Sequence, residues 1–416
     1  MGLSGVQRVS KFVKYLPEYG WNPIVVTTGP TLYYAEDQTL LDEVESSNIT
    51  IVRTESSARV KKLMEAGTVK MPRERIRRTF SRMSSALFVP DGKKSWARKA
   101  VALAREVISQ HPIDVIFASG PPFSTLMAGA QISAESGIPF VADYRDLWYG
   151  NQFHSYPTLW HKHKHMQYEH DTLARAARIT VTNRRMKEYL IATYKHLDFR
   201  DVVIIPHGWD RSDFPSTMPQ APYQSTNTNR ALRLTFSGTF YDVVTPVPLF
   251  KAVRKLRKER PDVNIELHFA GMLREEYKRK ARRMKLNDIL IDHGYLAHKE
   301  SVELLVNSDV LWLMLGNTRN IDTWAPAKFY EYIGTSKPIL ACVPDGVIKS
   351  DAMSYKAAWI TAPDDVKAIA TALSEIYDQW RAGTLPRPDQ AFVNSFQRQA
   401  QAGELARTLA TALRVI

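Results

Sequence analysis

Short β-branched runs alternate with longer amphipathic stretches along almost the whole 416-residue chain, and this alternation constrains the fold more than any other feature. The runs have the length of strands, and the stretches between them have the apolar period of helices. Strands that alternate with helices form parallel βαβ units, so the sequence predicts an α/β protein. The predicted strands cover residues 23–28, 49–53, 113–119, 139–143, 179–182, 202–206, 232–237, 264–270, 289–293, 309–315, 338–343 and 358–361.

The alternation is interrupted once, at residues 215–230, where ten of sixteen residues are Pro, Ser, Thr or Asn. This composition is typical of a linker, so we predict two doubly wound, Rossmann-like domains that face each other across a cleft. The predicted divisions are residues 1–214, the linker 215–230, residues 231–388, and a final amphipathic segment at 389–416. The clearest predicted helices cover residues 9–15, 93–109, 123–136, 184–194, 247–259, 275–284, 299–307, 327–334 and 366–380.

Composition narrows the class of protein. Cys342 is the single cysteine, which excludes an intramolecular disulfide framework and a cysteine-based zinc site. No run of about 18 apolar residues could span a bilayer, and the first twenty residues lack the apolar core of a signal peptide. We therefore expect a cytoplasmic protein. A formal net charge of +13 implies attraction to something anionic.

Residues 59–82 carry nine Lys or Arg against two Glu, with apolar side chains interleaved. This pattern suits a peripheral contact with an anionic membrane surface, which would place the protein on the cytoplasmic face of the inner membrane. A solvated basic surface explains the pattern equally well. Nucleic acid is not expected as a partner, because the chain contains no recognised RNA- or DNA-binding motif.

We predict an anion-binding site in the segment around residues 312–341. A buried strand ends near Leu315 and is followed by a polar loop that contains Arg319. Pro326 suits the first turn of the next helix, whose free N–H groups can hold a phosphate. Lys328 adds a positive charge, and Glu331 lies on the same helix face. A nucleotide diphosphate needs such a lysine beside a carboxylate for sugar hydroxyls; a surface Lys–Glu pair is the plain alternative.

A second cluster of charges follows the strand at residues 139–143. Arg145 could bind a phosphate, and Asp143 or Asp146 could orient or deprotonate an acceptor hydroxyl. The alternative is an Arg–Asp ion pair that ties the loop to the sheet.

Two further strand ends carry candidate acceptor-side residues. Ser119 and Pro121 open one helix, and His207 precedes a turn that contains Asp210. Plain turns would explain both segments.

The histidine-rich run HKHKHMQYEH at residues 161–170 contains side chains that could bind a metal ion. On a helix His161, His165 and Glu169 share one face, but neither ligand geometry nor supporting groups are visible in the sequence. We therefore expect no metal and no cofactor.

The start of the chain has one unusual feature. GLSGVQR, residues 2–8, is typical of a glycine loop that opens a helix, yet only Met1 precedes it, where such a loop follows a strand. We therefore expect the first strand of the N-terminal domain to be absent from this chain; the alternative is that residues 2–8 do not form such a loop.

Taken in order, these segments resemble family 4 glycosyltransferases of the GT-B fold, in particular the bacterial branch that makes capsule, exopolysaccharide or O-antigen. The resemblance extends over nearly the whole chain. Its segments are GLSGVQRVSKFVKYLPEYGWNPIVVT, FVPDGKKSWARKAV, IDVIFASGPPFSTLMAG, IPFVADYRDLW, ARITVTNRRMKEYL, IPHGWDRSDF, SGTFYD, HFAGM, HGYLAHKESVELLVNSDVLWLML and PAKFYEYIGTSKPILA.

The resemblance implies a retaining, metal-independent transfer of a sugar from a nucleotide-sugar, bound by the C-terminal domain, to an acceptor hydroxyl on the N-terminal side. The acceptor would be a glycan or a polyprenyl-linked molecule. Lys328 and the helix start at Pro326 would stabilise the departing diphosphate, and Glu331 would hold ribose hydroxyls. Gly5 would let the opening loop approach the diphosphate, which Arg8 could contact. Gly238 and Arg319 complete the implied donor site. The final helix would cross back onto the first domain.

Three departures from the family pattern are visible. The first of two paired glutamates falls on Thr323, an Arg and a Lys are missing after SGTFYD, and a first-domain histidine is replaced by Arg145 or Asp146. Two alternatives therefore stay open: a non-hydrolysing sugar-nucleotide epimerase on the same fold, and a non-catalytic sugar-nucleotide-binding protein.

Overall fold

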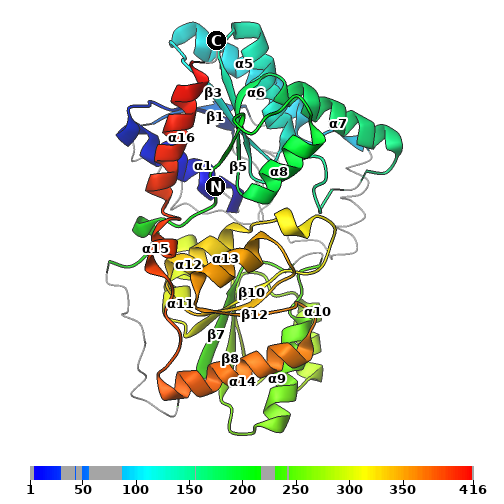
Figure 1. Ribbon diagram of the computed structural model, residues 1–416, viewed down its shortest axis with the longest axis vertical. Helices are drawn as coiled ribbons and strands as arrows, with labels where there is room; N and C mark the ends of the chain where they lie inside the picture. Colours follow the sequence, from blue (N-terminus) through cyan, green and yellow to red (C-terminus); the bar gives the residue numbers. More distant parts are fainter. Residues whose placement is uncertain are drawn as a thin grey trace. The chain divides into compact units, whose positions relative to one another are not determined.

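The computed structural model describes residues 4–29, 43, 49–55, 87–154, 156–216, 230–240 and 243–414, and it divides into two units. The first unit contains Met1–Pro206 together with Gln399–Ile416, and the second contains His207–Arg398. In each unit parallel strands are covered by helices (Figure 1). The predicted α/β class is therefore confirmed.

The first unit has two parallel sheets in its described part, β1-β2 and β3-β4-β5-β6. Every strand of the second sheet pairs with its sequence neighbour, and β4 is buried along its whole length. The elements are α1 (Ser4–Tyr15), η1 (Leu16–Tyr19), β1 (Ile24–Thr28), β2 (Thr50–Thr54), α5 (Lys94–Gln110), β3 (Ile116–Gly120), α6 (Phe123–Ser136), β4 (Phe140–Tyr144), α7 (Leu159–Leu173), β5 (Ala176–Val181), α8 (Arg184–Thr193), β6 (Val202–Ile204) and α16 (Arg398–Ala412).

The C-terminal helix α16 packs on the first unit. Its small and apolar residues, among them Ala402 and Leu405, share one buried cluster with Phe12 of α1 and Val141 of β4. The Tyr19 hydroxyl also donates to the Gln399 carbonyl at 2.9 Å. Burial of this apolar face holds together two segments that lie almost 400 residues apart in the sequence.

The second unit has one parallel sheet of order β12-β11-β10-β7-β8-β9, so the chain winds outward from β7 in one direction and from β10 in the other. Its elements are η2 (Arg211–Asp213), β7 (Leu232–Ser237), α9 (Val247–Glu259), β8 (Ile265–Ala270), α10 (Glu275–Arg283), β9 (Leu290–Gly294), α11 (His298–Val306), β10 (Val310–Met314), η3 (Ile321–Thr323), α12 (Ala327–Gly334), β11 (Ile339–Cys342), α13 (Val347–Tyr355), β12 (Ala358–Thr361), α14 (Val366–Ala382) and α15 (Gln390–Asn394).

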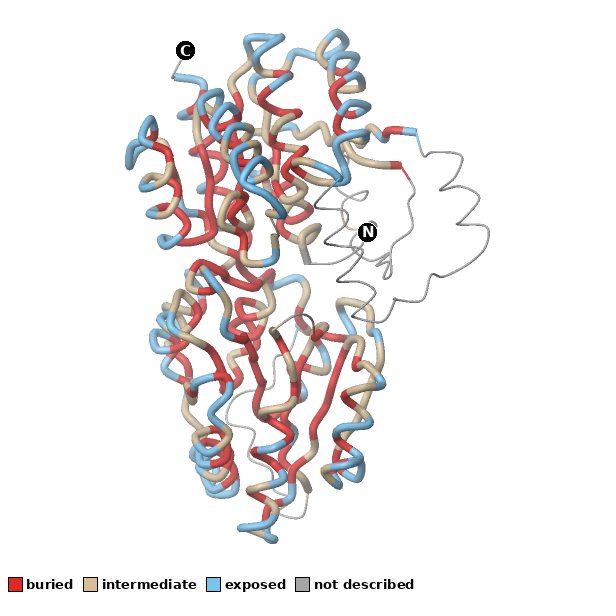
Figure 2. Tube along the Cα trace, turned by 90° about the vertical axis from the view of Figure 1, so that its right-hand side faces the viewer, coloured by how far each residue is buried: buried red, intermediate tan, exposed pale blue. Residues whose placement is uncertain are grey.

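Burial follows the sheets. Figure 2 shows buried trace along the strands of both units and alternating exposure along the helices around them. In the second unit β10 and β11 are buried at every position. This is expected of strands covered on both faces, and it explains why their sequences are continuous apolar runs.

Each predicted strand is present, with its ends shifted by up to three residues, and three larger differences from the prediction concern the first helix, the domain division and the final segment. Helix α1 begins at Ser4, so Gly5 and Arg8 lie inside it rather than in a loop. The units divide after Pro206, because Trp209 and the residues after it pack within the second unit; the Trp209 indole N–H donates to the Val393 carbonyl at 2.9 Å. The predicted final segment forms two helices, α15 in the second unit and α16 in the first.

Two further expectations concern parts of the chain that the structure describes only partly or not at all. Most of the predicted linker, residues 217–229, lies outside the described residues, and so does the whole basic segment 59–82. None of the helices within the described ranges combines the length and apolarity that a bilayer crossing requires.

Candidate functional site

The strand order of the second unit reverses between β7 and β10, and doubly wound sheets bind ligands beyond the strand ends at such a reversal. β7 runs directly into Gly238, whose φ is +128°. A Cβ atom on Gly238 would lie 2.5 Å from Lys328 Nζ. The backbone angle favours glycine here, and the missing side chain leaves the space at the end of β7 that the Lys328 ammonium occupies.

Lys328 lies in the first turn of α12, directly after Pro326, as the sequence predicts. Its Nζ is 4.3 Å from the ring centroid of Phe236, and the side chain is half-buried. Burial lowers the pKa of Lys328 to about 8, although the nearby Glu331 carboxylate opposes the shift. An ammonium with so little hydration gains from a bound anion, and the first N–H groups of a helix favour the same charge. This arrangement can hold a phosphate.

Glu331 lies one turn after Lys328, and its Oε1 is 2.5 Å from Nε2 of His298. His298 is the first residue of α11, so the contact joins two helices. Only 18% of the Glu331 side chain and 10% of the His298 side chain are exposed. The carboxylate is therefore held in place beside the lysine and can accept hydrogen bonds from hydroxyl groups.

The loop after β10 contains the other candidates of this unit. Arg319 is exposed in that loop, where it can reach an anionic ligand. Thr323 is buried, and its hydroxyl donates to the Asn320 carbonyl at 2.8 Å. Position 323, where the family pattern has a glutamate, thus stabilises a turn and offers no carboxylate.

In the first unit, Arg8 and Asp143 form a fully buried ion pair. Arg8 Nη2 is 2.9 Å from Asp143 Oδ1, and the guanidinium also donates to the carbonyls of Ile205 and Pro206. Burial raises the pKa of the Asp143 carboxyl, but the Arg8 charge and hydrogen bonds outweigh this effect and hold the pKa below its usual value.

This pair changes the roles expected of both residues. Arg8 was expected to contact a diphosphate, but its donors are taken up by the protein interior. Asp143 was a candidate to deprotonate an acceptor, but it also accepts from the hydroxyls of Ser119 and Thr180, at 2.6 and 2.7 Å. A carboxylate with four donors around it and no exposed surface stabilises the sheet end instead.

Arg145 connects the first turn of α1 to the turn after β3. Its guanidinium donates to the carbonyls of Gly5, Gly120 and Pro121. A Cβ atom on Gly5 would lie 2.9 Å from Arg145 Nη1, so Gly5 makes room for this arginine rather than for a phosphate. Burial lowers the pKa of Arg145, while Asp143 and Asp146 oppose the shift.

Asp146 is the acid of this cluster whose environment suits proton transfer. It is half-buried, and burial raises the pKa of its carboxyl, an effect that Arg145 partly offsets. Ser119 and Pro121 lie on the same sheet edge, because both contact the Asp143–Arg145 segment. The structure therefore brings together the acceptor-side candidates of the first unit.

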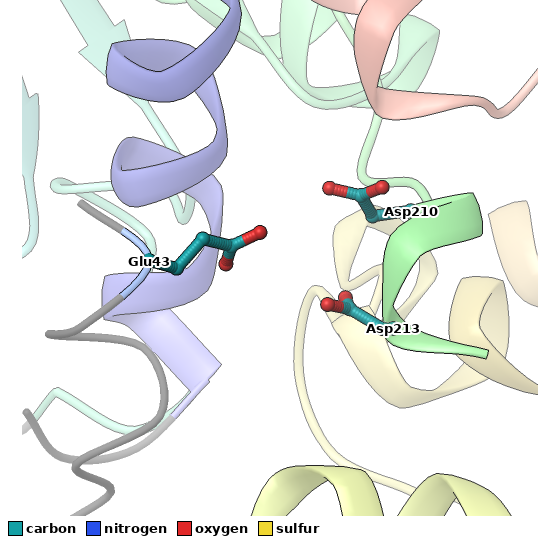
Figure 3. Close-up of side chains that lie close together, drawn as sticks. All are labelled: Glu43, Asp210 and Asp213. Carbon is teal, nitrogen blue, oxygen red and sulfur yellow. The ribbon is translucent and has the colours of Figure 1, made fainter. Parts of the chain in front are cut away.

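His207 is the exception, because it belongs to the second unit. It is buried, with its ring 6.2 Å from that of Tyr330. Asp210, which follows, accepts from the backbone N–H and the hydroxyl of Ser212, both at 2.9 Å. It lies where η2 begins (Figure 3). The hydrogen bonds of Asp210 are those of the turn proposed as the plain alternative.

The histidine-rich helix α7 anchors the loop that precedes it. His165 Nδ1 accepts from the Trp148 indole at 3.0 Å, and Glu169 accepts from the Tyr149 N–H and the Tyr194 hydroxyl. Burial lowers the pKa of His165 to about 4 and raises that of Glu169 to about 8. These inward-facing side chains have structural partners in the loop that also carries Arg145 and Asp146.

Sequence reasoning missed two features of the second unit. One is His298, whose only signal was its place at the start of a helix after a Gly-Tyr turn. The other is Gly271 after β8, where a Cβ atom would lie 2.3 Å from the Gly238 carbonyl oxygen. Its signal was the glycine that ends the strand in HFAGM.

The model of Glycosyltransferase Family 4 matches residues 5–213, half of the chain, and that span includes α1, the Arg8–Asp143 pair and the Arg145 loop. The chain belongs to Glycosyltransferase Family 4. No curated protein matched this glycosyltransferase by sequence.

Solved structures show the same GT-B fold over both units. Sucrose-phosphate synthase from Thermosynechococcus elongatus is 14% identical, with a TM-score of 0.64, and the match covers 99% of this chain and 94% of that one. Anabaena HepE in complex with UDP and glucose is 14% identical, with a TM-score of 0.63 over 99% and 97% of the two chains. A Listeria monocytogenes protein described as a UDP-N-acetylglucosamine 2-epimerase is 12% identical, with a TM-score of 0.52 over 92% and 95%.

Proposed function

We propose that this glycosyltransferase moves a sugar, with retention of anomeric configuration, from a nucleotide-sugar to a hydroxyl of a glycan or polyprenyl-linked acceptor in cell-surface polysaccharide synthesis. The donor binds to the second unit and the acceptor to the first. The observation that carries the proposal is Lys328, held over the glycine at the end of β7 in the first turn of a helix. The binding of UDP by Anabaena HepE supports a nucleotide donor.

In the proposed reaction, the bond between the anomeric carbon and the diphosphate oxygen breaks while the acceptor oxygen bonds to that carbon. Negative charge grows on the departing diphosphate. The Lys328 ammonium and the N–H groups at the start of α12 stabilise that charge, with Arg319 as an additional contact. This positive charge is our reason to propose that no metal is needed. Asp146 takes the proton of the acceptor hydroxyl.

Lys328→Ala tests this proposal. Removal of one group that stabilises leaving-group charge lowers kcat by roughly 10²–10³-fold. The increase in Tm on addition of UDP, GDP, ADP or dTDP identifies the nucleotide that binds. This increase should be smaller in Lys328→Ala than in the wild type. Arg407→Ala is a matched control, since Arg407 is an exposed base on α16 paired only locally with Glu404. Unchanged turnover in Lys328→Ala would remove Lys328 from the site.

Retention and acceptor class need separate measurements. The anomeric configuration of the product, determined by NMR, decides between retention and inversion. Lipid-linked and free glycans, offered in parallel, decide the acceptor class. A flotation assay with lipid vesicles, prepared with and without anionic lipid, tests peripheral association with the membrane. The basic composition of residues 59–82 supports this part of the proposal.

A second candidate is sugar-nucleotide epimerisation, favoured by the shared fold of the Listeria protein. An epimerase converts the donor without an acceptor. Incubation with donor alone therefore separates the two: a new sugar-nucleotide would support epimerisation, and an unchanged donor that is consumed only with acceptor would support transfer.

A further inference from the structure

We propose that one face of the first unit is a docking surface for an anionic lipid bilayer. The face consists of residues 87–99, Phe153 and residues 157–164, and we call it the α7 face. The proposal deepens the proposed function and rests on it for its purpose: it assigns described residues to membrane association and to the side on which a lipid-linked acceptor would arrive.

The α7 face exposes large apolar side chains. Of the eleven such side chains exposed in the described part of the chain, five lie here. Leu159 and Trp160, the first residues of α7, are 83% and 58% exposed, and Leu87 and Phe88 are 71% and 49% exposed; Phe153 is the fifth. Helix α7 extends outward from the sheet of the first unit (Figure 1). Single exposed apolar residues are ordinary, but a group on one face marks an interaction site.

The two chain segments that form the α7 face are neighbours in space. Lys94 Nζ, at the start of α5, lies 5.1 Å from the ring centroid of Tyr168 on α7. His154, on the loop before α7, is close to the other segment as well. Burial lowers the pKa of His154, and the backbone of Pro90 and the carboxylate of Asp91 oppose that shift. The exposed apolar side chains of both segments therefore belong to one surface.

The charge of the α7 face is positive and unopposed. Residues 92–104 and 152–168 contain no Asp or Glu. Six cations of these segments have no carboxylate partner among the described residues: Lys93, Lys94, Arg98, Lys99, Lys162 and Lys164. Apolar side chains ringed by cations suit an anionic bilayer, because the apolar groups insert while the cations meet headgroup phosphates. In the sequence, four residues separate the basic segment 59–82 from Leu87, so the positive charge continues along the chain.

The same charge argues against a second copy of this chain as the occupant. A twofold-symmetric contact uses the same patch on both copies, so the six cations would lie opposite six others. Like charges that face each other without an acid between them weaken an interface. An anionic lipid surface gains from the same six charges.

The α7 face adjoins the acceptor-side candidates of the first unit. The ring centroid of Phe123, two residues after Pro121, is 6.0 Å from that of His154. Asp91 accepts from the backbone N–H and the hydroxyl of Ser124, at 2.9 and 2.8 Å, at the start of α6. A lipid-linked acceptor held in the bilayer would therefore arrive beside the strand end that carries these candidates.

Flotation of the full chain with vesicles tests the proposal. We expect the wild type to bind vesicles of phosphatidylglycerol and phosphatidylcholine at least about tenfold more tightly than vesicles of phosphatidylcholine alone. Leu159→Ser/Trp160→Ser should weaken binding to the anionic vesicles about tenfold or more, because two apolar side chains no longer insert. Lys93→Glu/Lys162→Glu, with one charge reversed on each segment, should weaken it by a similar factor of about ten or more.

The controls separate docking from general damage. All four substituted side chains are exposed, so both double variants should keep the wild-type Tm. Met353→Ser removes an equally exposed apolar side chain from α13 of the second unit and should float as wild type. Brominated lipid should quench Trp160, which is measured as the difference in fluorescence between the wild type and Trp160→Phe.

Several results would overturn the proposal. One is wild-type flotation of the folded Leu159→Ser/Trp160→Ser protein, which would place membrane binding elsewhere. Another is a wild type that self-associates in sedimentation velocity through these two side chains and floats regardless of them, which would assign the face to a second copy. A wild type that binds a nucleotide but does not float would overturn the docking surface alone. A wild type that floats but binds no nucleotide would contradict the proposed function and leave the docking surface supported.

Discussion

Substitution of Arg8 by methionine should lower the free energy of unfolding of the first unit. It should not weaken nucleotide binding by the second unit. Arg8 is fully buried and donates to Asp143 and to two backbone carbonyls. Methionine fills much of the same volume but leaves Asp143 with only the two hydroxyls of Ser119 and Thr180. A buried ion pair that loses one partner costs about 3–5 kcal/mol, because the remaining charge stays desolvated. For a unit of this size the Tm should fall by roughly 6–20 °C.

A double-mutant cycle with Asp143→Asn isolates the charge. The asparagine keeps an acceptor for the two hydroxyls and removes the unpaired anion, so the double variant should be more stable than the sum of the single effects predicts. Equilibrium urea unfolding measures each free energy. Arg105→Met is a matched control: Arg105 forms a two-bond pair with Glu135 in the same unit, but both side chains are exposed. Loss of this exposed pair should change the free energy of unfolding very little, because solvent screens the two charges.

The pH dependence gives a further check. In wild type the Asp143 pKa is held below its usual value, so its contribution is present at neutral pH and is lost only as pH falls through that low pKa. In Arg8→Met only the Ser119 and Thr180 hydrogen bonds still oppose the effect of burial, so the pKa of Asp143 should rise and protonation should relieve the buried charge. The difference between variant and wild type should therefore shrink from pH 7 toward pH 5. Near-wild-type stability of Arg8→Met at pH 7, or additive single effects, would refute the structural role of the pair.

Three other outcomes follow from the buried ionisable groups. Affinity for the nucleotide that the thermal-shift screen identifies should fall as pH rises through about 8, where Lys328 loses its proton. Lys328→Arg should bind without that dependence because a guanidinium stays charged; parallel curves for both proteins would contradict the assigned pKa. The pKa of Glu169 is raised from 4.5 to about 8, so its stabilising effect is complete below about pH 4.5 and is lost as pH rises through 8. Glu169→Gln should remove that loss, and urea unfolding at pH 5 and pH 8 measures it; an unchanged difference between the two pH values would exclude a buried acid at this position. Asp146→Asn should lower kcat by about 10²-fold or more with little change in UDP affinity, and steady-state kinetics that show the reverse would assign Asp146 to binding.

The sequence by itself determined the order and type of the elements. Apolar period and turn residues are local properties, which is why α6, α9 and α12 begin and end at the predicted residues. The start of α12 after Pro326 and the one-turn spacing of Lys328 and Glu331 are local in the same sense, so the positions of these candidate residues on α12 could be predicted.

Only the tertiary structure decided which charges meet. Arg8 pairs with Asp143, 135 residues away, and Arg145 binds carbonyls near both Gly5 and Pro121. His298 meets Glu331 across 33 residues. A charged residue in a sequence has many acceptable partners, since an ion pair needs only opposite charge and proximity. Burial then selects among them, because a desolvated charge is tolerated only where the fold surrounds it with donors or acceptors. That selection turned two expected ligand contacts, Arg8 and Gly5, into parts of the scaffold.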